Sequence, residues 1–328
     1  MSLTRPTADT ARPGVGRAVA VLVLVAVAAL IPLLGPRVAL DGTGEAAAPG
    51  VVGISVLRTV LFAALCVPAG EVFAAWLARR VPGAPSEAPR SWAPYAAAAG
   101  FVAALGLASV VATGNLVPRS PADIDVGGLY ETRDGKLALL EVNAFAAAGL
   151  CALSRRPATQ VWPLAAVAVA EALRAHPTTE HGALTGSGLT LVHVVCASLW
   201  VGGLFHVLRM LRQWGVTEAG AALLGLYARV AAVLLAAVTA TGVWSTLRRM
   251  PPDTVLEQLT TTAYGRALLA KVLLMAVVAA LALVSRVRLA RASDPLSACS
   301  PARAEVVVLG AVVAVSALLT ALPVPIRW

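Results

Sequence analysis

Residues 193–211 have the sequence HVVCASLWVGGLFHVLRML, an almost unbroken apolar run with a histidine near each end. Together with its apolar flank, from about residue 187, the run is long enough to cross the roughly 30 Å apolar core of a membrane as a helix. Polar side chains at such depth are costly and are often functional. The stretch therefore predicts a membrane-spanning helix, and it makes His193 and His206 candidate functional residues.

The whole chain has the composition of a membrane protein. Of its 328 residues, 59% are hydrophobic and 13% are charged, whereas a soluble domain has about 25% charged residues. The short alternating segments of a transmembrane barrel are not evident. We predict an all-α integral membrane protein, a polytopic helix bundle in a lipid bilayer. The net charge of +9 does not indicate nucleic-acid binding, because the basic residues stand between apolar runs, as in membrane loops.

Nine segments are apolar and long enough to be spans, with eight spans as the alternative count. The first has a long apolar stretch without a convincing cleavage site, so we interpret it as an uncleaved span rather than a signal peptide. A polar tail (1–16) would precede helices 1–5 (17–176) and helices 6–9 (177–328). The predicted spans are 17–36, 51–78, 92–113, 137–154, 159–176, 187–211, 221–247, 264–288 and 304–324.

The distribution of basic residues predicts the orientation. With the N-terminus inside, the inner segments hold 14 Lys and Arg residues against five acids, and the outer segments hold nine of each sign. Because inner loops are enriched in basic residues, we predict a cytoplasmic N-terminus and an extracytoplasmic C-terminus. No nucleotide-binding loop is evident in the sequence.

Six ionisable residues remain within the predicted spans, three acids and three bases. Such groups usually face the bundle interior and pair or line a polar path. We expect an ion pair between Glu71 and Arg229 in the inner half, and one between Arg58 and either Glu141 or Glu171 in the outer half. Lys271 has no obvious counter-ion, and we expect it to neutralise Glu171 or Glu141 until a cation displaces it.

All four histidines lie between residues 176 and 206. His193, Cys196, Trp200 and Gly203 share one helix face, since they stand at i, i+3, i+7 and i+10. The outer part of the bundle can gather a metal site, because imidazole and carboxylate suit copper, zinc, nickel or iron. Its predicted ligands are His176, His181, His193 and Glu171.

The second histidine of the run cannot share that site. His206 lies 13 residues beyond His193, about 20 Å along a helix, and would be a ligand on the release side. The alternative for each histidine is a packing group hydrogen-bonded to a neighbouring helix.

Four blocks of sequence occur in the order found in a known family. They are LVHVVCASLWVGGL (191–204), YARVAAVLLAAVTATGV (227–243), TTTAYGRALLAKVLLM (260–275) and SALLTALPVP (316–325). Over residues 187–325 the chain resembles the copper resistance protein D (CopD) family, with His193, Trp200, Gly202, Gly203, Arg229, Tyr264, Gly265, Arg266 and Lys271 at motif positions.

The resemblance implies a multi-pass protein of the bacterial cytoplasmic membrane that handles copper, of either valence, with zinc as an alternative. It also implies an extracytoplasmic copper-binding protein as a partner. We expect copper import rather than enzymatic activity, with Cys196, Trp200, His206, Lys271, Glu141 and Arg58 near the path. Two alternatives are a copper-binding protein that delivers without transporting, for example to oxidase assembly, and a metal-dependent membrane enzyme with Glu171 as a base.

Overall fold

The computed structural model describes residues 15–114, 116–118, 120–176, 182–215, 217–250, 252–291 and 299–323. Within these residues the chain is helical and contains no strand, so the predicted all-α fold is confirmed. Eight helices are long and apolar enough to cross a membrane. They are α1 (Val15–Leu40), α2 (Val51–Ala78), α3 (Ala93–Ala112), α5 (Arg133–Leu153), α7 (Ala183–Trp214), α8 (Glu218–Arg249), α10 (Ala263–Arg291) and α11 (Cys299–Ala321).

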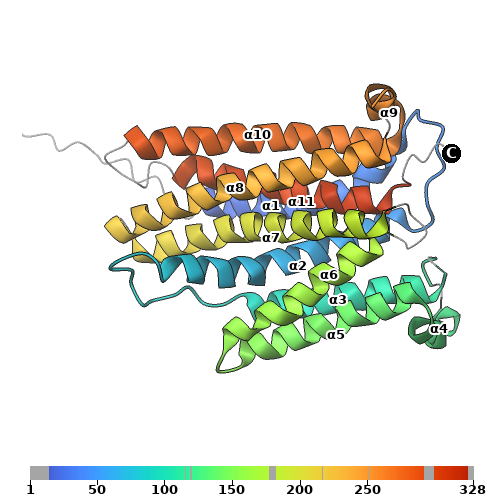
Figure 1. The fold of residues 1–328 in the computed structure, drawn as a ribbon, viewed down its shortest axis with the longest axis horizontal. Helices are drawn as coiled ribbons and strands as arrows, with labels where there is room; N and C mark the ends of the chain where they lie inside the picture. The colour runs from blue at the N-terminus through green and yellow to red at the C-terminus, as the bar shows by residue number, and fades with distance from the viewer. Residues whose placement is uncertain are drawn as a thin grey trace, which may run out of the picture.

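The remaining predicted span, the fifth in chain order (159–176), falls on a shorter helix. It comprises the end of the 3-10 turn η2 (Pro157–Gln160) and α6 (Val161–Arg174), a helix of 14 residues. At about 1.5 Å per residue α6 is roughly 21 Å long, less than the apolar core of a membrane. Figure 1 shows α6 leaning across the bundle between α5 and α7, with which it packs.

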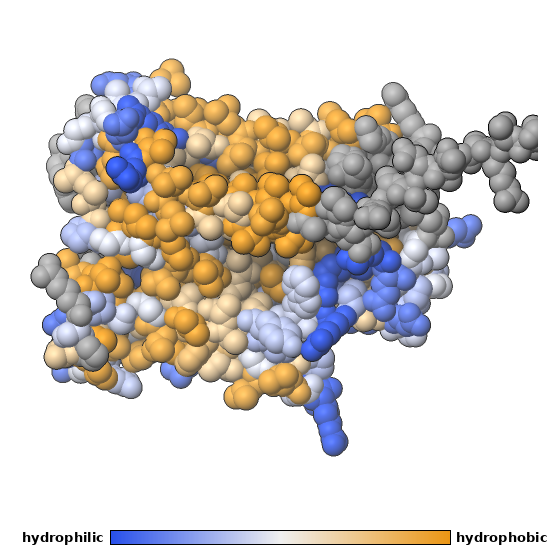
Figure 2. Space-filling model, turned by 180° about the vertical axis from the view of Figure 1, so that it is seen from behind, coloured by the Kyte–Doolittle hydropathy of each residue, from blue (hydrophilic) through white to orange (hydrophobic). Residues whose placement is uncertain are grey.

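Short helices and loops mark the two ends of the bundle. Helix α4 (Val126–Glu131) and helix α9 (Val255–Thr261) lie at one end (Figure 1), which we call the α4 end. At the opposite end, the loop after α2 meets the last turns of α7, where the Trp214 indole donates to the carbonyl of Glu87. Figure 2 shows hydrophobic residues across the middle of one face and the most hydrophilic residues towards its ends.

Side-chain caps explain where several helices begin. The carboxylate of Asp125 accepts from the Gly128 amide at the start of α4, and the hydroxyls of Thr132 and Thr217 do the same for α5 and α8. Each cap satisfies an amide that has no partner within the helix. A glycine with φ of 69°, Gly215, ends α7.

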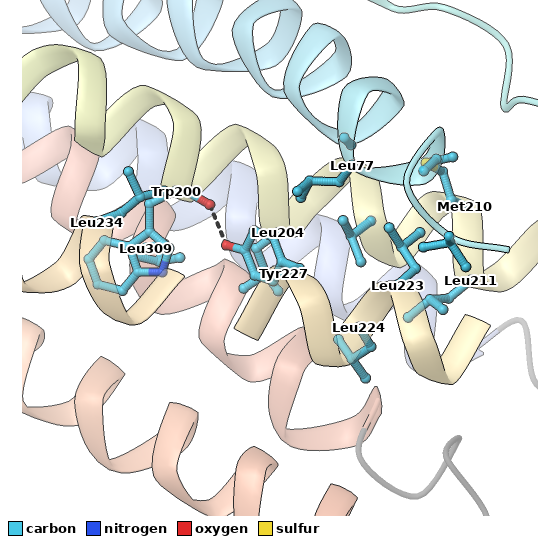
Figure 3. Packing of buried hydrophobic residues seen from close by; sticks show 14 of the residues in the cluster. Leu77, Trp200, Leu204, Met210, Leu211, Leu223, Leu224, Tyr227, Leu234 and Leu309 are labelled. Atoms are coloured by element: carbon cyan, nitrogen blue, oxygen red, sulfur yellow. Dashed lines mark hydrogen bonds between the residues drawn. The ribbon is translucent and has the colours of Figure 1, made fainter. Parts of the chain in front are cut away.

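Two buried clusters make up most of the core, and α2 belongs to both. One joins α2 to α3, α5 and α6, with Phe145 and Leu61 fully buried at its centre. The other joins α2 to α7, α8, α10 and α11 around Trp200 and Tyr227 (Figure 3). Helix α1 packs on α11 and α2, so helices from the two predicted halves, 17–176 and 177–328, pack against one another.

Candidate functional site

The predicted face of α7 is turned towards α8. His193 Nδ1 lies 3.0 Å from Oγ1 of Thr241, and its ring lies next to Gly242. Further along, the carbonyl of Trp200 accepts a hydrogen bond of 2.7 Å from the Tyr227 hydroxyl (Figure 3). A side chain at Gly203 would meet the same tyrosine ring. This face therefore forms the α7–α8 contact.

The hydrogen bonds of Thr241 define how His193 can act. The Thr241 hydroxyl donates to the carbonyl of Ala237 at 2.7 Å. A hydroxyl has one proton, so in this arrangement it accepts from the Nδ1–H of His193. That tautomer leaves the Nε2 lone pair as the group that can bind a proton or a metal.

The charged groups around His193 are basic. Lys271 on α10 lies within electrostatic range of the His193 ring, and Arg249 lies within range of Lys271. Arg249 also donates to the Tyr264 hydroxyl at 3.2 Å. We expected Lys271 to neutralise Glu171 or Glu141, but both carboxylates are engaged by arginines on other helices. The Lys271 prediction is therefore wrong in its choice of partner.

The other end of the histidine run has a different environment. His206 is buried, and its Nδ1 lies 3.5 Å from Nη1 of Arg209. The Arg209 guanidinium lies over the Trp92 ring, 4.5 Å from its centroid, and donates to the carbonyl of Arg90.

Cys196 is half-buried one turn after His193, on the α4 side of Trp200.

The predicted metal site does not assemble from the residues that the structure describes. His176 packs against Gly186 and its Nε2 lies 3.0 Å from Oγ1 of Thr190, so it faces the first turns of α7. His193 instead faces α8, and His181 lies outside the described residues. Among those described, no three His, Cys, Asp or Glu side chains are grouped so that they could hold a metal ion.

Glu171, the fourth predicted ligand, belongs to a buried cluster of four charges. Nη1 of Arg58 lies 2.7 Å from Oε1 and 2.5 Å from Oε2 of Glu171. Nη2 of Arg174 lies 3.0 Å from Oε2 of Glu141, and its Nη1 lies 4.0 Å from Oε1 of Glu171. Both Glu171 oxygens are therefore engaged by guanidinium groups, and a metal ion would have to compete with them.

Sequence reasoning anticipated one pair in this cluster and missed a member. An Arg58 pair with Glu141 or Glu171 was expected, and the structure shows the one with Glu171. Arg174, near the end of the predicted span 159–176, was not among the six ionisable residues expected within the spans. Its spacing of three residues from Glu171 was the available signal, since side chains at i and i+3 are neighbours on a helix.

The predicted ion pair between Glu71 and Arg229 is absent from the described residues. The Glu71 carboxylate accepts from the Trp92 amide at 3.2 Å, and Arg229 is exposed on α8. The pairing was wrong because sequence does not show which face of α8 is turned to its neighbours.

Comparison with known proteins connects the chain to one family. Residues 221–319, from α8 to α11, match the family described as Copper resistance protein D. The match includes Arg229, Tyr264 and Lys271 but not α7, which holds His193. No curated protein and no solved structure matches the chain. The similarity to this family is therefore shown for a segment, and it agrees with the family suggested by the sequence motifs.

Proposed function

We propose that this multi-pass membrane protein transports copper across the bacterial cytoplasmic membrane, with His193 as a ligand on the path. The similarity of α8–α11 to copper resistance protein D carries the copper assignment. The contact of His193 with Thr241 puts the imidazole against the first helix of the matched segment. We expect import, with copper supplied by an extracytoplasmic copper-binding protein.

The chemistry of this region suits a passing metal better than a stored one. Imidazole and thiol groups bind copper and zinc, and His193 and Cys196 stand one helical turn apart. The positive charges of Lys271 and Arg249 weaken the binding of a cation beside them. Passage requires binding strong enough to admit an ion and weak enough to release it, so these neighbours favour transport over tight binding and delivery.

The membrane potential can supply part of the drive. An inward-moving cation gains about 2.3 kcal/mol per charge per 100 mV. The proposal does not include an enzymatic step, since the transport of an ion breaks no covalent bond.

Copper flux into proteoliposomes tests the proposal. We expect His193→Gln to lower the initial rate at least tenfold, because the amide can still bond to Thr241 but lacks the imidazole lone pair. His176→Gln is the matched variant, since it changes the imidazole bonded to Thr190, and it should keep at least half of the rate. Thermal unfolding of each variant checks that the fold is retained.

The outcomes separate the alternatives. Wild-type flux retained in His193→Gln would show that the imidazole is a packing group. Copper bound to the wild type without flux would favour a delivery protein. The absence of both copper flux and bound copper would contradict copper handling.

A further inference from the structure

The four-charge cluster lies within the bundle, towards the α4 end. Glu141 is eight residues into α5 from its first residue, about 12 Å along the helix axis. Arg58 is seven residues into α2, and Arg174 is the last residue of α6. The cluster therefore joins three helices that all lie outside the segment matched to copper resistance protein D.

Glu141 is the least satisfied member of the cluster. Its side chain is fully buried, and Oε1 makes no hydrogen bond to any described residue. Its other oxygen has only the ion pair with Arg174. A buried carboxylate normally accepts several hydrogen bonds, so the charged form of Glu141 is poorly supported here.

The neighbouring carboxylate of Glu171 further disfavours the charged form of Glu141. Glu171 lies close enough to Glu141 to repel it when both are ionised. Two facing carboxyl groups can form a hydrogen bond only if one of them carries a proton, and such pairs hold a shared proton. Glu171 has the Arg58 guanidinium at 2.5 Å, so the proton belongs on Glu141.

The helices packed against α5 offer no competing charge at this depth. Helix α2 contributes Arg58, and α6 contributes Glu171 and Arg174. Among the described residues, α3 has one titratable group, Tyr95, which is exposed and accepts from Arg90. The other titratable or charged groups of α4 and α5 lie near the helix ends: Tyr130, Glu131, Arg133, Asp134 and Lys136 within the last two residues of α4 and the first four of α5, and Cys151 near the end of α5. η2 has none.

We propose that Glu141 and Glu171 form a proton-binding site that couples proton movement to transport by this protein. A proton from water at the α4 end forms an O–H bond with Oε1 of Glu141, which then donates to the Glu171 carboxylate. The cluster changes from two positive and two negative charges to a net charge of +1. The Arg174–Glu141 ion pair is thereby replaced by a Glu141–Glu171 hydrogen bond, which changes the contact between α5 and α6.

The coupling role rests on the proposed transport function, whereas proton binding does not. Infrared difference spectra of the purified protein between acid and neutral pH test proton binding directly. We expect a carboxylic-acid band that disappears in Glu141→Gln and shifts in Glu141→Asp. Glu257→Gln, a change of an exposed carboxylate on α9, should keep the band. An identical spectrum in wild type and in both Glu141 variants would overturn the site.

Flux measurements then test coupling. In the wild type we expect the copper flux to change several-fold with the pH outside the vesicles, and in Glu141→Gln to become independent of pH. A pH-dependent flux in a well-folded Glu141→Gln would overturn the coupling role. If no copper moves in any variant, the transport proposal fails, and the infrared band still decides whether Glu141 binds a proton.

Discussion

The two halves of the bundle hold their buried charges in opposite ways. Around Glu171, two acids and two bases from α2, α5 and α6 balance one another. Near His193, the neighbouring charge is Lys271 on α10, and Lys271 itself has the positive Arg249 of α8 as a neighbour. A balanced cluster fixes helices and can store a proton, whereas a neutral imidazole beside cations binds a metal only weakly. The difference supports the two proposals, proton binding in the first region and metal passage in the second.

The largest expected effect comes from breaking the balanced cluster. Arg58→Met leaves Glu171 buried with only a distant guanidinium, and removing one partner of a buried ion pair costs about 3–5 kcal/mol. The free energy of unfolding, measured by denaturant titration in detergent micelles, should fall by that amount. The double variant Arg58→Met/Glu171→Leu should recover most of it, because an apolar pair replaces both charges. If the double variant is the less stable one, the balance of charge is not what stabilises this region.

A smaller effect is expected where the two regions meet, at the contact between α2 and α7. A side chain at Gly202 would collide with the carbonyl oxygen of Cys66, so Gly202→Ala must push the helices apart. Overpacking of this kind costs about 1–3 kcal/mol. Gly188→Ala on the same helix, which would contact nothing within 4 Å, is the control for the same unfolding measurement. Equal stability of the two variants would show that this contact is loose.

The smallest effect concerns a neutral hydrogen bond in the second region. Tyr227→Phe removes the 2.7 Å bond to the Trp200 carbonyl and should lower the free energy of unfolding by about 0.5–1.5 kcal/mol. Tyr95→Phe, a change at an exposed ring, should have no measurable effect. If Tyr227→Phe lowered the free energy of unfolding more than Arg58→Met does, the comparison between the two regions would be reversed.

Much of the fold could be predicted from the sequence, because hydropathy and length are local properties of the chain. Eight of the nine predicted spans coincide with helices long enough to cross a membrane. The exception is 159–176, which is apolar enough to be a span but contains α6, a helix of only 14 residues. The i, i+3, i+7 spacing likewise indicated the α7 face that carries His193 and Trp200, since helical periodicity is also local.

The partners of the polar side chains depended on the tertiary structure. Arg58 and Glu171 are 113 residues apart in the chain, and their meeting depends on the rotation of α2 and α6 about their own axes. The hydrogen bonds of His176 to Thr190 and of His193 to Thr241 depend on helix rotation in the same way. So does the ion pair of Arg174 with Glu141. Composition and periodicity determined that this is a helical membrane protein. Only helix packing decided which buried charges balance, because the free energy of a buried charge depends on neighbours that are distant in the sequence.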